Sequence, residues 1–174
     1  YDGTNFYTFI NTFNMKCPSA KRGKNKQGRN KLRQINYALF CSADSHVPLF
    51  YNLYEGNRND AKEFPLMLEQ FHNFLEEVFG PNDSPPETTL VFDKGNNSKD
   101  NFLLLDSYPS FNYVGSVKLD EHKDLACISN NDPYFKECQG LEETKAFKVQ
   151  RKVYGKQRTL VITYNKNFST SQLL

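Results

Sequence analysis

The chain has 174 residues, of which 38% are hydrophobic and 14% aromatic, so it can bury one core with room for a small subdomain. Its 22 basic and 20 acidic residues give a net charge of +2, too small a total to identify a polyanionic partner. Cys17, Cys41, Cys127 and Cys138 form no CxxC pair, so they predict neither a zinc site nor a disulfide framework. No run approaches the roughly 18 apolar residues that a membrane span needs. We expect a cytoplasmic protein without membrane contact.

Three β-strands are predicted near the start of the chain. Residues 1–10, 33–43 and 47–55 are rich in aromatic and β-branched side chains, and Asp44 and Ser45 mark a turn between the second and the third. Three consecutive strands favour an antiparallel meander. Because the first residue already belongs to a predicted strand, we expect the chain to be part of a longer protein.

A helix is predicted after these strands, because apolar residues recur at helical spacing over 64–78. Asn59 or Asp60 can cap its N-terminus, and Glu63 is placed to complete a capping box. Gly80 marks its end.

A second strand-and-helix group follows a proline-rich linker. Residues 88–93 (TTLVFD) predict a short buried strand, Ser98 begins a helix that continues to Leu105, and residues 111–118 predict another strand. A right-handed crossover through the preceding helix should make the buried strand parallel to an earlier one. The fold class is therefore α/β, with residues 1–118 as the core.

The chain becomes β-rich and polar after residue 118. Residues 119–165 predict a β insertion that ends in a hairpin, with its turn at Tyr154 to Gln157 and a positive φ at Gly155. Residues 166–174 predict the beginning of a helix that leads out of the insertion.

Two aspartates stand at strand ends in this pattern. Asp2 lies in YDGTNFYTF, and Asp93 ends the strand in LVFDKGNNSKDN. If the two strands are neighbours, the carboxylates repel unless a cation lies between them, and hard oxygen ligands suit Mg²⁺ or Mn²⁺. An ordinary turn aspartate and a solvated aspartate at a chain end explain the same residues, so both interpretations stay open.

A basic loop is predicted between the first two long strands, because the segment KRGKNKQGRNKLR has no acidic residue. Such a loop can neutralise DNA phosphates. Its glycines and asparagines, and the absence of aromatic residues for base stacking, fit a solvated mobile loop equally well. The candidate DNA-binding residues are Lys21, Arg22, Lys24, Lys26, Arg29, Lys31 and Arg33.

An ordered series of segments resembles the DDE transposases of bacterial and archaeal insertion sequences, in the group that carries a β insertion. The segments are YDGTNFYTF, GRNKLRQINYALF, PLFYNLYEGNRND, LVFDKGNNSKDNF and VYGKQRTLVITYN. The resemblance implies a ribonuclease H-like mixed sheet flanked by helices, with the β-rich insertion after the fifth strand. It also implies that Asp2 and Asp93 are catalytic metal ligands for Mg²⁺ or Mn²⁺.

The implied activity is nicking of transposon ends and transfer of the strand into double-stranded target DNA, by a dimer on DNA in the nucleoid. The family's third carboxylate is a glutamate in a Tyr, two residues, Arg, three residues, Glu pattern, which this sequence lacks. Glu142 and Glu143 are acidic but belong to the insertion. We therefore expect that the chain stops short of the glutamate and is inactive alone. The alternatives are an inert DNA-binding remnant of a transposase and another ribonuclease H-like nuclease.

Overall fold

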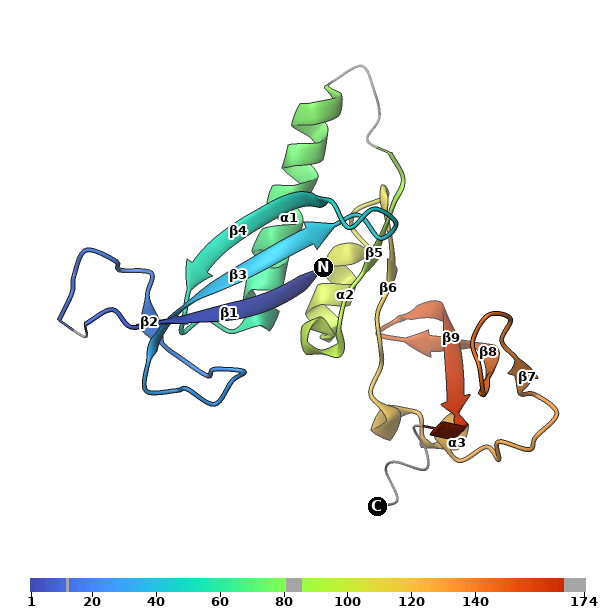
Figure 1. The fold of residues 1–174 in the computed structure, drawn as a ribbon. Helices are drawn as coiled ribbons and strands as arrows, with labels where there is room; N and C mark the ends of the chain where they lie inside the picture. Colours follow the sequence, from blue (N-terminus) through green and yellow to red (C-terminus); the bar gives the residue numbers. More distant parts are fainter. Residues whose placement is uncertain (12, 81–85, 168–174) are drawn as a thin grey trace. The chain divides into compact units, whose positions relative to one another are not determined.

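The structure, a computed structural model, describes residues 1–11, 13–80 and 86–167 and is of mixed α/β type (Figure 1). It divides into two compact units, a first unit of Tyr1–Ser116 and a second unit of Val117–Leu174. The elements of the first unit, in chain order, are β1 (Asp2–Thr8), β2 (Lys21–Arg22), β3 (Arg33–Cys41), β4 (Pro48–Glu55), α1 (Asp60–Phe79), β5 (Thr88–Val91), the 3-10 turn η1 (Lys94–Asn96), α2 (Lys99–Leu105) and β6 (Phe111–Val114).

Strand β3 is the centre of a four-stranded antiparallel sheet. β1 pairs along one of its edges, from Asp2 opposite Leu39 to Thr8 opposite Arg33, and β4 pairs along the other. The short β2 continues the β4 edge, where it pairs with Gln34 and Arg33. The predicted antiparallel meander is confirmed.

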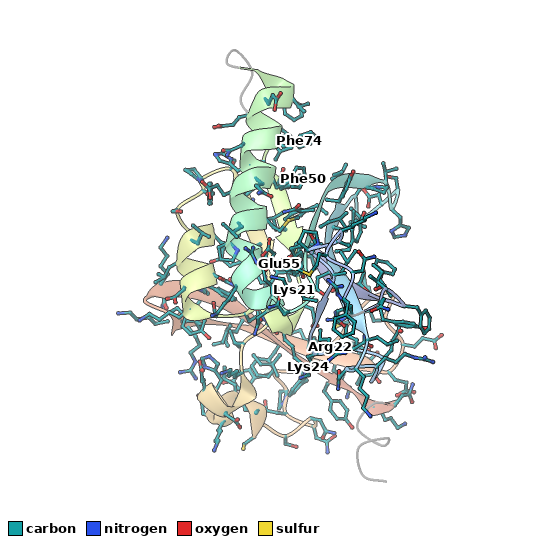
Figure 2. The ribbon with its side chains drawn as sticks, turned by 90° about the vertical axis from the view of Figure 1, so that its left-hand side faces the viewer. Lys21, Arg22, Lys24, Phe50, Glu55 and Phe74 are labelled. Carbon is teal, nitrogen blue, oxygen red and sulfur yellow. The ribbon has the colours of Figure 1, made fainter. Side chains whose placement is uncertain are left out.

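One face of this sheet packs against α1, as Figure 1 shows. Alternate residues of β3 are buried, and the ring of Phe40 stacks on Phe71 of α1 with centroids 4.3 Å apart. Phe50 of β4 contacts Phe74 one helical turn further along, at 5.4 Å (Figure 2). These contacts show that the apolar residues predicted along one side of the helix belong to the core. Burying an aromatic side chain of this kind stabilises the fold by about 1.5–3 kcal/mol.

Strands β5 and β6 form a separate parallel pair, with Thr88 opposite Phe111. The predicted cap of α2 is confirmed, since Ser98 Oγ accepts a hydrogen bond of 3.1 Å from the backbone N–H of Asn101. β6 ends at Val114 rather than at residue 118, because the chain then turns to Asn97, whose side chain binds Ser116.

The two sheets of the first unit meet at the beginning of β1. There the backbone nitrogen of Tyr1 donates a hydrogen bond of 2.8 Å to the carbonyl of Val91, the last residue of β5. No ladder forms between β1 and β5 in the described residues, so the predicted single mixed sheet is observed as two sheets. The ribonuclease H-like arrangement stays a prediction.

The second unit is built on a three-stranded antiparallel sheet in the order β7-β8-β9. The turn between β8 and β9 has positive φ at both Tyr154 (49°) and Gly155 (89°), the type I′ geometry that matches strand twist, which confirms the expected Gly155 conformation. The helix predicted within residues 166–174 falls largely outside the described residues. The elements are η2 (Leu119–Glu121), α3 (Lys123–Ala126), β7 (Lys136–Glu137), β8 (Thr144–Val153) and β9 (Lys156–Asn165).

Gly56 permits a close backbone approach that ties the end of β4 to β2 and β3. A Cβ atom there would lie 2.0 Å from the carbonyl oxygen of Gln34 and 2.6 Å from that of Lys21. We expect Gly56→Ala to destabilise the first unit by about 1–3 kcal/mol or more, as overpacking does, in thermal unfolding followed by circular dichroism.

The matched control is Gly95→Ala, because a Cβ at Gly95 meets nothing within 4 Å. Equal melting temperatures for the two variants would show that the contact at Gly56 is not needed for folding.

Candidate metal centre and basic loop

Asp2 lies at the start of β1, on the face of the sheet opposite to α1. Along this strand Gly3 and Asn5 are buried, whereas Asp2 and Thr4 are exposed. One carboxylate oxygen of Asp2 accepts a hydrogen bond of 2.8 Å from the backbone N–H of Gly3. The carboxylate is therefore held close to the backbone and open to solvent.

Asp93 follows β5 and caps the turn η1. Its backbone is extended, and its Oδ1 accepts a hydrogen bond of 2.6 Å from the N–H of Lys94. The side chain is exposed, and within the described residues its Oδ2 accepts no hydrogen bond. Asp93 thus has the local role of a turn aspartate, with one oxygen remaining for another partner.

The residue preceding each aspartate is fixed in one aromatic cluster. The ring of Tyr1 contacts Phe40 at 4.8 Å and Phe64 at 5.1 Å, and Phe64 contacts Phe92 at 5.1 Å. Together with the hydrogen bond from Tyr1 to Val91, these contacts hold the beginning of β1 beside the end of β5. Asp2 and Asp93 therefore emerge from the same part of the first unit.

The donor set at this place consists of two carboxylates. No group of three or more His, Cys, Asp or Glu side chains that could hold a metal occurs among the residues that the structure describes. Mg²⁺ is usually bound by one or two carboxylates together with waters and substrate phosphates, so the residue types of Asp2 and Asp93 suit Mg²⁺.

Asparagine and serine side chains support the backbone after Asp93, a role that the sequence did not reveal. Buried Asn101 donates a hydrogen bond of 2.7 Å from its amide to the carbonyl of Asn96, and the Asn97 amide donates one of 2.7 Å to Ser116 Oγ. These bonds fix the loop that carries Asp93. The signal in the sequence was the density of short polar side chains in GNNSKDN.

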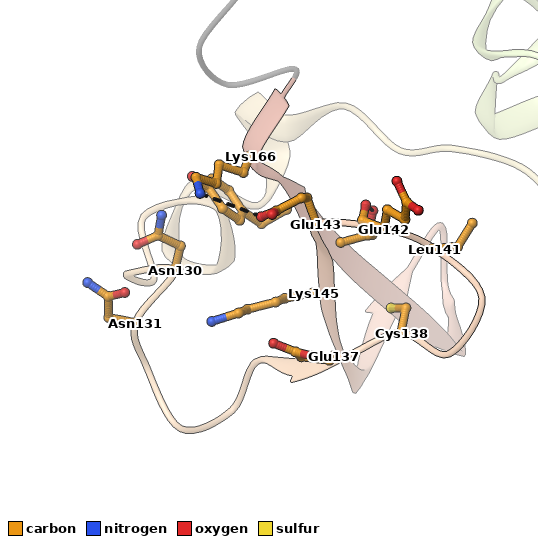
Figure 3. Close-up of a pocket in the computed structure, with 11 residues that line it drawn as sticks. Asn130, Asn131, Glu137, Cys138, Leu141, Glu142, Glu143, Lys145 and Lys166 are labelled. Carbon is orange, nitrogen blue, oxygen red and sulfur yellow. Dashed lines mark hydrogen bonds and ion pairs between the residues drawn. The ribbon is translucent and has the colours of Figure 1, made fainter.

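Glu142 and Glu143 lie in the second unit, at a hollow that Glu137 and Lys145 also line (Figure 3). The carboxylate of Glu143 lies 3.7 Å from the ammonium of Lys166, whose backbone N–H donates to the Glu143 carbonyl. This pairing gives Glu143 a role inside the second unit.

Buried amides determine the course of the basic loop. The Asn25 side chain donates a hydrogen bond of 2.8 Å to Gln34 Oε1, and Gln34 Nε2 donates one of 2.7 Å to the carbonyl of Gly56. Asn30 Oδ1 accepts a bond of 2.8 Å from the Asn25 backbone. The asparagines that suggested mobility in the sequence are thus the groups that fix the loop.

Arg33 is occupied by the neighbouring loop rather than directed at solvent. Its guanidinium donates hydrogen bonds to the carbonyls of Asn14 at 2.7 Å and Cys17 at 2.9 Å, and further bonds to those of Asn11 and Ala20. Five donors in a rigid fork suit this task. Arg33 therefore organises the chain between β1 and β2.

The other cations of the loop differ in their surroundings. Lys26 donates to a carbonyl of β1, and the Arg29 guanidinium lies over the ring of Tyr7 at 5.0 Å. Lys24 and Lys31 are exposed and make no ion pair within the described part of the chain, and Arg22 is exposed as well. Lys24 and Lys31 are the loop cations best placed for an external anion.

Four charged residues form a cluster where the basic loop meets the beginning of α1. Lys21 lies 2.6 Å from Glu55 (Figure 2), Arg58 Nε lies 3.8 Å from Glu55, and Arg58 Nη1 lies 2.9 Å from Glu63. Glu63, which was expected to complete a capping box, forms an ion pair with Arg58. Its side chain is only 3% exposed, and a buried carboxylate needs the cationic partner that Arg58 supplies.

No family model, curated protein or solved structure matches this chain. Among the described residues, no helix is long and apolar enough to cross a membrane.

The Glu55 carboxylate links stability to pH. The hydrogen bond from Lys21, followed by the attraction of Lys21 and Arg58, lowers the pKa of Glu55 below its ordinary value of 4.5. Because the folded-state pKa is the lower one, this stabilisation is present above about pH 4.5 and is lost as the pH falls further. We expect Glu55→Gln to reduce the loss of melting temperature on acidification.

The control is Glu77→Gln, which removes an exposed carboxylate that makes no ion pair within the described residues. If Glu55→Gln and Glu77→Gln gave the same dependence of melting temperature on pH, Glu55 would have no part in acid sensitivity.

Proposed function

We propose that the chain is part of the catalytic core of a DDE transposase, which cuts transposon DNA ends and joins them to target DNA by divalent-metal phosphoryl transfer. The observation that supports this most directly is the hydrogen bond from Tyr1 to Val91, since it brings Asp2 and Asp93 to the same end of the first unit. The resemblance assigns the same two residues as the first two ligands of the catalytic metal.

In this proposal Asp2 and Asp93 hold Mg²⁺ or Mn²⁺ through their exposed carboxylates. A bound divalent ion activates a water or a 3′-hydroxyl and stabilises the leaving oxygen. The chain's own contribution is position: β1 fixes Asp2, and the turn η1 fixes Asp93. The third ligand of the family is a glutamate in a spacing that these 174 residues lack, so metal binding by this chain should be weak.

Double-stranded DNA is the proposed partner, contacted through the basic loop. Lys24 and Lys31 supply positive charge and form no ion pair with any residue that the structure describes, and the amide network holds the backbone beneath them. Phosphate neutralisation by fixed cations gives binding that is independent of base sequence. The same proposal puts the protein on DNA in the cytoplasm, as a dimer across two transposon ends.

An inert DNA-binding remnant of a transposase is the second candidate. Its support is the cap that Asp93 forms on η1, because this structural role needs no metal. Another ribonuclease H-like nuclease would share the aspartate pair. A measurement of metal binding distinguishes these candidates, because the transposase and the other nuclease would both bind a divalent metal and the inert remnant would not.

We expect the chain to bind Mn²⁺ weakly but saturably, as measured by the loss of the free-ion signal in electron paramagnetic resonance. Asp2→Asn and Asp93→Asn should each weaken binding at least about tenfold, since losing even a supporting partner of a metal ligand costs that much.

Asp100→Asn is the control, because Asp100 is an exposed aspartate in the first turn of α2. Retention of Mn²⁺ affinity in Asp93→Asn would rule out the proposed ligand set and favour the inert remnant.

The basic loop is tested by the double variant Lys24→Gln with Lys31→Gln. If both lysines contact phosphates, the slope of log affinity against log salt for duplex DNA should become shallower by about 2. Fluorescence anisotropy with a labelled duplex measures the slope. The control pair, Lys16→Gln with Lys62→Gln, removes the same charge from exposed sites outside the loop, and an equal effect of both pairs would contradict a specific contact.

A further inference from the structure

The hairpin of the second unit concentrates positive charge. Strands β8 and β9, Thr144 to Asn165 with their turn, contain no acidic residue. The nearly neutral total charge of the chain conceals this local excess. The six cations of the hairpin are Lys145, Lys148, Arg151, Lys152, Lys156 and Arg158.

The register of the hairpin separates an apolar face from a polar face. Phe147 lies opposite Ile162 and Val149 opposite Leu160, so these side chains share one face. Because side chains alternate along a strand, Lys148 and Lys152 lie on the other face. Lys136 of β7 joins them there, since it pairs with Ala146, two residues before Lys148.

Two cations on the apolar face, Arg151 and Arg158, are matched within the second unit. Arg151 forms an ion pair of 2.6 Å with Asp124 of α3, and Arg158 donates a hydrogen bond of 3.1 Å to the carbonyl of Val153. Both long side chains therefore have internal partners, and they are poor candidates for binding an external anion.

The cations on the polar face lack such partners. Lys136, Lys148 and Lys152 are exposed, and their ammonium groups make neither an ion pair nor a hydrogen bond within the described residues. Between the last two on the same face of the strand lies neutral Gln150, which donates a hydrogen bond of 2.7 Å to Thr159 across the strands. We call Lys136, Lys148 and Lys152 the lysine face.

We propose that the lysine face binds the phosphate backbone of duplex DNA. This inference goes beyond the proposed function, because it assigns DNA contact to the second unit whether or not Asp2 and Asp93 hold a metal. Lys148 and Lys152 are four residues apart on one strand, about 13 Å. At about 3.4 Å of rise per base pair, this distance equals the rise of roughly four base pairs along the helix axis.

The shape of the hairpin favours a duplex as the partner. β7 pairs with β8 only at Lys145 and Ala146, so from Phe147 to the turn the hairpin is a two-stranded ribbon. A ribbon of this width fits within the major groove of B-DNA, where rows of phosphates flank it on both sides. The lysines are regularly spaced along the ribbon, as the phosphates are along a duplex. This arrangement matches the charge of a duplex better than that of an irregular acidic protein surface.

The test compares two triple variants of the chain that remove the same charge. Lys136→Gln, Lys148→Gln and Lys152→Gln together neutralise the lysine face, whereas Lys62→Gln, Lys99→Gln and Lys123→Gln neutralise exposed lysines on three helices. Binding to a fluorescein-labelled random-sequence duplex is measured by anisotropy over a range of salt. In the first variant, and not in the second, we expect the slope of log affinity against log salt concentration to become shallower by about 3.

Equal salt slopes in the two triple variants, with circular dichroism spectra like that of the unchanged protein, would overturn the proposal and leave the lysines as protection against strand pairing. A lysine-face variant that lost binding to poly-glutamate but kept its duplex slope would also overturn it, in favour of an acidic protein partner. The Mn²⁺ measurement is independent, because loss of the salt slope can occur with or without a metal at Asp2 and Asp93.

Discussion

The contact between Tyr1 and Val91 is the constraint on which the functional account depends. It joins a four-stranded antiparallel sheet to a separate parallel pair, and the aromatic cluster of Tyr1, Phe64 and Phe92 packs around it. Asp2 and Asp93 each follow a residue of this contact region directly. A pair of carboxylates distant in sequence thereby comes to one end of the first unit.

Polar side chains organise much of the structure around that contact. Gln34 and Asn25 hold the basic loop, Arg33 holds the preceding loop, and Arg58 neutralises buried Glu63. An unpaired buried polar group costs free energy, so each of these bonds restricts the backbone to few alternatives. Lys24 and Lys31 of the loop, and the lysine face, make no ion pair with the described part of the chain and are therefore available to a polyanion.

The sequence predicted helices and strands well where the sequence pattern arises from the same interaction that stabilises the element. The apolar spacing of α1 reflects its packing on β3, and Ser98 caps α2 because its hydroxyl satisfies a free backbone N–H. Predictions that needed a distant partner were weaker. The spacing of Glu63 gave no sign of its ion pair with Arg58, and the sequence shows no link between Arg33 and the carbonyls it binds.

At the candidate site too, local features were predicted from the sequence and long-range contacts were not. Sequence position indicated that Asp93 ends a strand and begins a turn, which the cap on η1 bears out. That the beginning of β1 lies beside the end of β5 follows from tertiary packing of aromatic rings and could only be assumed from the resemblance. The net charge of the chain predicted neither the lysine face nor the ion pair of Lys21 with Glu55. Both depend on where the charges lie in the fold, which composition does not show.

A crystal structure of the chain grown with Mn²⁺ would show whether Asp2 and Asp93 share a metal ion. We expect an anomalous peak bound by carboxylate oxygens of both Asp2 and Asp93, at about 2.0–2.2 Å, the range of short bonds between small divalent ions and oxygen. Ordered carboxylates of Asp2 and Asp93 more than about 10 Å apart, with no Mn²⁺ between them, would contradict it, because one metal centre cannot bridge that separation.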